Sequence, residues 1–186
     1  MRRTRYLSDY ALNERIDDRG RIRTEAVYRG DRYTLLLRGE QLKKAKLLFS
    51  SLTGVILCAY LWALLTNAPC AHCWYVLMPM AVSVFPVFHA AAACGCLLTA
   101  KQPLTREEND RIGPRFAASV TFLLILSGIS LAGSVVYMIK YISLDPDAFP
   151  RRNFVYPAAE LIMLVCSGVL FSRRKDLSSE KLEKKA

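Results

Sequence analysis

The sequence predicts an all-α integral membrane protein with four transmembrane helices, on three observations. No Asp, Glu, Lys or Arg occurs from Leu47 to Ala100, although charged residues make up 23% of the chain. This run is long enough for two bilayer-spanning helices of roughly 20 residues each and a short connection. Two further apolar stretches follow, and four apolar helices would leave a water-soluble protein little to expose to water. We therefore expect spans at 47–67, 74–98, 116–142 and 156–172.

The positive charges are distributed asymmetrically about these spans. Of the 26 Lys and Arg residues, all but Lys140, Arg151 and Arg152 lie before the first span, between the second and third, or after the fourth. The positive-inside rule then places both termini in the cytoplasm and the 68–73 and 143–155 loops outside. The expected protein is a multi-pass protein of the plasma (inner) membrane. Its parts are a basic cytoplasmic extension, a transmembrane domain and a basic cytoplasmic tail, at 1–46, 47–172 and 173–186.

The N-terminal extension is too long and too hydrophilic for a secretory signal peptide, so the first span is expected to stay in the protein. Two runs rich in Ile, Thr, Val and Tyr flank Arg29-Gly30-Asp31, and this pattern predicts a β-hairpin. An isolated hairpin is marginal in water, so we expect it to rest on another part of the chain. Next come Lys43, Lys44 and Lys46, which are expected to bind anionic lipid headgroups. No module typical of nucleic-acid binding occurs.

The loop between the second and third spans contains Thr105-Arg-Glu-Glu. A threonine followed by acidic residues is typical of a helix start, because the acids lie in the first turn near the positive end of the helix. We expect a short helix there, along the membrane surface. The tail after the fourth span is polar and is expected to fray.

Pro79 and Pro86 both lie within the second span. Each removes a backbone donor, so we expect a kinked helix. Such kinks occur at transporter substrate sites and also as ordinary packing geometry. The sequence leaves both interpretations open.

The third span carries small residues four positions apart, which let a neighbouring helix approach closely. The pairs are Gly128 with Ala132 and Ser130 with Ser134. They predict a packing seam, either within the bundle or with a second copy of the protein.

Three ionisable residues are expected in or near the hydrocarbon, where such residues are functional candidates. Glu160 lies about one turn inside the outer end of the fourth span, and Lys140 lies near the outer end of the third. Their similar depth predicts that they pair, or that Lys140 extends outward to the headgroups. His89 lies deeper in the second span. We expect it to be neutral and bonded to a serine or a backbone carbonyl.

Of the six cysteines, only Cys70 and Cys73 are expected outside the hydrocarbon. The predicted orientation places them at the outer surface, where disulfides persist in bacteria. Their position at the start of the second span would stabilise a thiolate and lower its pKa. A structural zinc needs four ligands, and His72 between the thiols has no fourth group nearby, so no metal site is expected. The remaining cysteines lie within spans, where a thiol behaves as a small hydrophobe; they are Cys58, Cys94, Cys96 and Cys166.

The segment PCAHCWY, at the outer start of the second of four spans, resembles the disulfide bond formation protein B family. The resemblance implies a four-helix membrane thiol oxidase in which Cys70 and Cys73 pass electrons to a bound quinone. The chain departs from that family at two points. The predicted outer loop between the third and fourth spans has no cysteine, and Leu77 stands where the family has an arginine near the quinone.

Three functional hypotheses follow. The first is a membrane subunit, scaffold or small transport component that works with a membrane-protein partner or a second copy, without redox chemistry or a cofactor. The alternative is a thiol–disulfide oxidoreductase using Cys70 and Cys73, and only then a quinone. The third is a stand-alone transporter using Glu160 and the kinked second span. Loss of activity in Cys70→Ser or Cys73→Ser would favour the alternative, and loss in Glu160→Gln or Pro86→Ala would favour the third.

Overall fold

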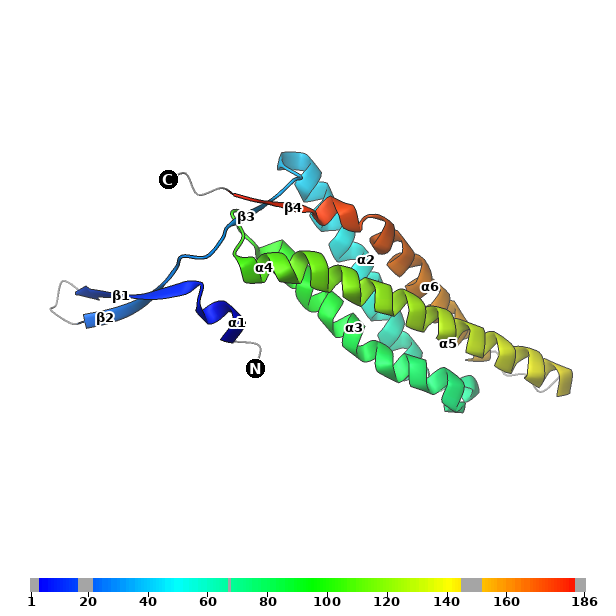
Figure 1. Cartoon of the computed structure of the whole chain (residues 1–186). Helices are drawn as coiled ribbons and strands as arrows, with labels where there is room; N and C mark the ends of the chain where they lie inside the picture. Colours follow the sequence, from blue (N-terminus) through cyan, green and yellow to red (C-terminus); the bar gives the residue numbers. More distant parts are fainter. Residues whose placement is uncertain (1–3, 17–21, 67, 145–151, 183–186) are drawn as a thin grey trace.

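Four long helices form the main body of the protein (Figure 1). The computed structural model describes residues 4–16, 22–66, 68–144 and 152–182. The long helices are α2 (Gly39–Leu65), α3 (Trp74–Thr99), α5 (Phe116–Leu144) and α6 (Arg152–Ser172). Each contains a segment long and apolar enough to cross a membrane, so the predicted fold class is confirmed.

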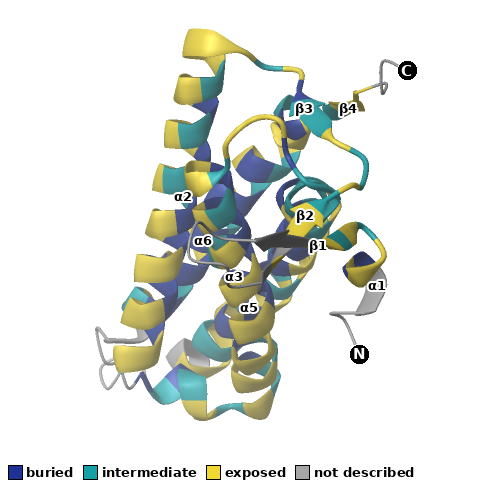
Figure 2. Ribbon diagram, turned by 90° about the vertical axis from the view of Figure 1, so that its left-hand side faces the viewer, coloured by how far each residue is buried: buried dark blue, intermediate teal, exposed yellow. Residues whose placement is uncertain are grey.

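The four helices pack as a closed ring around one core. Helix α2 contacts α3 and α6, and α5 contacts the same two helices from the other side. Phe49, Ile56, Leu123 and Met163 are among the fully buried side chains that fill the centre. Figure 2 shows the buried residues on the inward faces and exposed residues on the outward faces. The outward faces carry many exposed Leu, Val, Ile and Phe residues, as expected for a protein in contact with lipid.

The helices extend beyond the apolar stretches that predicted them. Helix α2 begins at Gly39 and α6 at Arg152, because polar residues next to the apolar stretches continue the helical hydrogen bonding. Asn67, where the first span was expected to end, and 145–151 within the expected outer loop lie outside the described residues.

The N-terminal segment forms a short helix, α1 (Thr4–Leu7), and an antiparallel hairpin, β1 (Tyr10–Ile16) with β2 (Ile22–Tyr28). The predicted pairing around Arg29-Gly30-Asp31 is therefore wrong. The amides of Arg29 and Gly30 both donate to the Asp9 carbonyl, at 2.7 and 3.1 Å, and so hold the end of β2 against the start of β1.

The strand after this point, β3 (Tyr33–Leu35), pairs instead with β4 (Ser179–Lys181) from the tail (Figure 1). Between α6 and β4 the chain makes one 3-10 turn, η3 (Arg174–Leu177). The Tyr33 amide also donates to the Leu104 carbonyl at 3.0 Å. The expected frayed tail is thus ordered through β4, while 183–186 lie outside the described residues. We call the end of the bundle that carries β3 and β4 the basic end. The opposite end, with Cys70 and Cys73, is the cysteine end.

A continuous helical segment leads from the basic end into α5. It begins with α4 (Arg106–Asp110), continues through one π-helical turn, η2 (Arg111–Arg115), and enters α5 without a break. Thr105 forms a capping box with Glu108, which confirms the predicted helix start. The prediction of a short separate helix along the membrane surface is wrong, because α4 continues through η2 into α5. Pro114 has no N–H to donate, and its place inside η2 accounts for the departure from α-helical hydrogen bonding.

Two tyrosines attach the N-terminal segment to this helical segment. The Tyr6 hydroxyl donates to Asp110 Oδ2 at 2.7 Å and accepts from Arg115 Nη2 at 2.8 Å. The Tyr28 hydroxyl accepts from the Arg106 amide at 3.0 Å. The hairpin therefore rests on the bundle, as its marginal stability in isolation predicts.

Candidate functional site

Glu160 lies in the centre of the bundle and is 1% exposed. Its Oε1 accepts a hydrogen bond from the Ser130 hydroxyl of α5 at 3.0 Å. The same hydroxyl lies 3.5 Å from the Val76 carbonyl oxygen of α3. Ser130 therefore links α3, α5 and α6 at one level of the bundle.

The second carboxyl oxygen of Glu160 has no partner. Among the residues that the structure describes, Glu160 Oε2 and the Tyr156 hydroxyl are buried without a hydrogen bond. The Tyr60 hydroxyl of α2 donates to the Met80 carbonyl at 3.4 Å rather than to Glu160. A carboxylate in such a place is costly, so a proton or a cation has to compensate its charge.

The predicted pairing of Glu160 with Lys140 is wrong. Glu160 is bonded to Ser130, and Lys140 lies ten residues further along α5, about 15 Å along the helix axis at 1.5 Å per residue. Lys140 is exposed towards the cysteine end. The two residues therefore lie at clearly different depths.

Cys70 and Cys73 lie at the cysteine end, in and directly after a 3-10 turn, η1 (Pro69–His72), that packs against α5 and α6. The Cys73 amide donates to the Cys70 carbonyl at 3.2 Å. Both thiols are free, and Cys70 is fully buried while Cys73 is partly buried. Burial raises the pKa of the Cys70 thiol to about 11. The predicted lowering of the pKa is wrong for Cys70, because its sulfur lies in the core rather than among the free amides of α3.

We expect Cys70 to be alkylated far more slowly than Cys73 by a membrane-impermeant maleimide. At a pKa of about 11, roughly one Cys70 thiol in ten thousand is ionised at pH 7. Labelling of Cys70 should rise about tenfold per pH unit up to that pKa, because the thiolate is the reacting form. Peptide mass mapping after timed labelling in nanodiscs measures both rates, and the unfolded protein is the control. Equal and rapid labelling at pH 7 would contradict the burial of Cys70.

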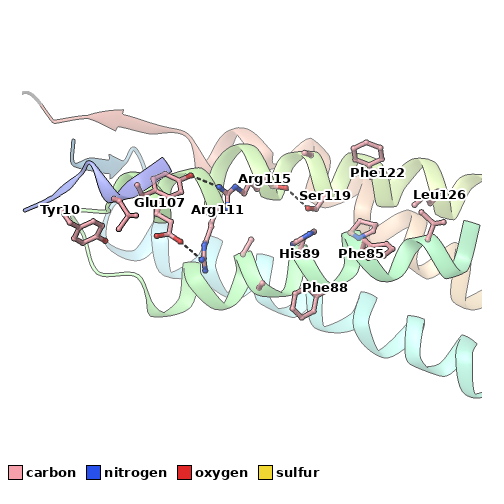
Figure 3. A pocket seen from close by; sticks show the side chains of 17 residues that line it. Tyr10, Phe85, Phe88, His89, Glu107, Arg111, Arg115, Ser119, Phe122 and Leu126 are labelled. Carbon is pink, nitrogen blue, oxygen red and sulfur yellow. Dashed lines mark hydrogen bonds and ion pairs between the residues drawn. The ribbon is translucent and has the colours of Figure 1, made fainter. Parts of the chain in front are cut away.

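His89 is exposed on α3, and its side chain lies at a pocket between α3 and α5 (Figure 3). No hydrogen bond joins it to a serine or a carbonyl in the described part of the chain, so the predicted bond is wrong. Its ring instead contacts Phe88, with centroids 5.9 Å apart. Because His89 faces outward, it lies away from Glu160.

The small residues of α5 face in different directions. Ser130 and Ser134 are fully buried, whereas Ala132 is exposed. A Cβ on Gly128 would meet only Leu164 of α6, at 3.8 Å. The close approach is at Gly133, where an added Cβ would lie 3.2 Å from the Tyr75 carbonyl oxygen of α3. In a regular helix the Tyr75 carbonyl would accept a hydrogen bond from the amide four residues later. That residue is Pro79, which has no N–H to donate.

The lysines before the first span lie at the start of α2. Lys43 and Lys44 are exposed. Lys46 lies with its Nζ 3.5 and 3.4 Å from the carbonyl oxygens of Leu98 and Ala100. A cation at the C-terminal end of α3 is favourable for the helix dipole, so Lys46 stabilises a helix end.

Several residues at these sites were not found from the sequence. Tyr156 lies four residues before Glu160 and so shares its helix face. This spacing could have predicted that Tyr156 lies beside Glu160. Gly133 had no such signal, since its contact depends on the packing of α3 against α5. The described residues hold no group of three or more His, Cys, Asp or Glu side chains that could bind a metal.

A scan against protein-family models finds no match, and searches of curated proteins and of solved structures find none either.

Proposed function

We propose that the chain is a small transport component of the membrane in which Glu160 binds and releases a proton. The observation that carries this proposal is a buried carboxyl with one oxygen bonded to Ser130 and the other without a partner among the described residues. Ionisable residues inside a membrane bundle are rare and mark proton or ion pathways. A membrane-protein partner or a second copy would pack on the exposed helix faces.

Proton binding at this position can be coupled to helix movement. Glu160 is on α6 and its donor Ser130 is on α5. A hydrogen bond to a charged group contributes about 1.5–3 kcal/mol. A shift that separates the two residues would therefore change proton affinity by roughly 10- to 100-fold, and protonation would in turn favour one helix arrangement.

Proton movement into proteoliposomes tests the proposal. A potassium diffusion potential drives uptake, and an enclosed pH-sensitive dye reports it. We expect Glu160→Gln to abolish the uptake seen with the wild type, because glutamine keeps a bond to Ser130 and cannot exchange a proton. Glu180→Gln removes the same charge at the exposed basic end and should leave uptake unchanged. Uptake equal in wild type and Glu160→Gln, or no uptake above empty vesicles, would leave a subunit or scaffold role instead.

The thiol–disulfide alternative is supported by one feature. Cys73 directly follows η1, and its amide donates to the Cys70 carbonyl at 3.2 Å, so one backbone turn brings the two cysteines close together. The fit to a quinone is poor, because Leu77, where the resembling family has an arginine, is exposed and offers no polar contact. A disulfide that forms in cells, found as maleimide labelling of both cysteines only after reduction, would favour this alternative.

We also propose that the basic end faces the cytoplasm of the plasma membrane. The positive-inside rule supports this orientation, since the clusters of Lys and Arg lie at that end. Aromatic side chains gather at the cysteine end, as is typical of a membrane–water interface; they are Trp62, Trp74, Tyr141 and Phe154. Protease protection of a tag after Lys181 in inverted vesicles compared with right-side-out vesicles tests the orientation.

A further inference from the structure

A pocket of about 940 Å³ lies between α3 and α5 in the half of the bundle nearer the basic end (Figure 3). This volume is at the upper end of the roughly 300–1,000 Å³ typical of small-molecule sites. Glu160 and the cysteine pair are not among its lining residues. Its chemistry is therefore separate from that of the candidate functional site.

The part of the pocket away from the N-terminal segment is apolar and open to the outside of the bundle. Phe85 and Phe88 of α3 and Phe122 of α5 line it and are exposed by 67%, 68% and 63%. Pro86 also lines the pocket and leaves the Val82 carbonyl without its usual helical donor. Figure 3 shows Phe85, Phe88 and Phe122 along the helices, away from the polar end. A groove of this kind suits a hydrocarbon chain.

The end of the pocket nearer the N-terminal segment is cationic. Arg111 and Arg115, both in the π-helical turn, line it together with Glu107. Arg111 Nη2 lies 2.7 Å from Glu107 Oε1, and Arg115 Nη2 donates to the Tyr6 hydroxyl. A guanidinium has five N–H donors, so both arginines keep donors for a further anion. The charged residues that line this end are two arginines and one glutamate, which gives the lining a net positive charge; Asp110 is bonded to Tyr6 and is not among the lining residues.

We propose that this pocket binds one anionic phospholipid of the leaflet at the basic end. Arg111 and Arg115 would hold the headgroup phosphate, since guanidinium groups bind phosphate with charge-assisted hydrogen bonds. One acyl chain would lie along Phe85, Phe88 and Phe122. A free phosphate would leave that apolar part of the pocket empty, and a neutral apolar ligand would leave the arginines unused. The proposal does not depend on proton movement through Glu160.

Native mass spectrometry of the full chain in detergent, titrated with phosphatidylglycerol or phosphatidylcholine, tests the headgroup contact. We expect one phosphatidylglycerol to bind more tightly than phosphatidylcholine. The double variant Arg111→Gln/Arg115→Gln should weaken its binding by about tenfold or more, since it removes charge-assisted hydrogen bonds. The matched control is Lys101→Gln/Lys175→Gln, which removes the same charge from exposed positions at the same end and should stay within about twofold.

A second pair of variants tests the acyl-chain groove without touching an arginine. Ala118 and Ala132 are both exposed on α5, and only Ala118 lines the pocket. We expect Ala118→Phe to fill the groove and reduce phosphatidylglycerol binding, and Ala132→Phe to leave it unchanged. The proposal is wrong if the lysine control weakens binding as much as the arginine variant, if Ala118→Phe binds like the wild type, or if both lipids bind equally.

Discussion

Replacing Glu160 with leucine is expected to stabilise the bundle while removing its proposed function. Exchanging a buried, poorly paired charged group for a hydrophobic side chain of similar size is often neutral or stabilising, by about 1–4 kcal/mol. Glu160 has one hydrogen bond, and Oε2 has no partner among the described residues. Ser130 would lose that bond and still have the Val76 carbonyl 3.5 Å away.

Unfolding of the purified protein in mixed micelles, followed by circular dichroism as the SDS fraction rises, measures this change. Glu160→Gln is the matched variant, because it keeps a polar group beside Ser130. If Glu160 were a structural contact only, Glu160→Leu would destabilise the bundle by about 1–3 kcal/mol. A higher free energy of unfolding together with lost proton uptake would identify a residue kept for function at the expense of stability.

Gly133→Leu is expected to destabilise the packing of α3 against α5 by about 3 kcal/mol or more. An added Cβ would lie 3.2 Å from the Tyr75 carbonyl oxygen and 3.2 Å from Val76 Cγ2. Side chains can shift to relieve a tight contact, whereas the carbonyl moves only if α3 moves. The larger leucine side chain therefore forces the two helices apart, next to the Ser130–Val76 contact.

Gly54→Leu is the matched control for this substitution. Gly54 is exposed on α2 and an added Cβ meets nothing within 4 Å. That variant should be as stable as the wild type, or more stable by up to about 1 kcal/mol because leucine favours helix more than glycine does. Both variants are measured by the same SDS titration. Equal stability of Gly133→Leu and Gly54→Leu would show that α3 and α5 do not meet closely at this position.

The four spans could be predicted from the sequence because the bilayer imposes a simple rule on length and polarity. The uncharged run from Leu47 to Ala100 is far longer than one buried helix needs, and it matches two spans joined by a short connection. The extra strand pair could not be predicted, since β3 and β4 each have three residues and are far apart in the sequence. Short strands carry little periodicity, and their pairing is decided by tertiary contacts.

The candidate site was predicted in part. Glu160 stood out because an acidic residue within a span is costly. Its partner was misassigned, because the sequence gives the depth of a residue in the membrane only approximately. Several residues of α5 therefore had an expected depth similar to that of Glu160. Cys70 was expected to be reactive from its place before a helix, but burial outweighs the effect of the helix terminus. The pocket depends on the spacing of α3 and α5, which no single segment encodes.

The pairing of β3 with β4 joins a strand that precedes all four spans to one that follows them. The two strands can meet only on the same face of the bilayer, which requires an even number of membrane crossings between them. A chain that failed to insert one span would carry β3 and β4 on opposite faces, with both strand edges unpaired. The small sheet can therefore form only when an even number of spans has been inserted, and only after the fourth span has been made.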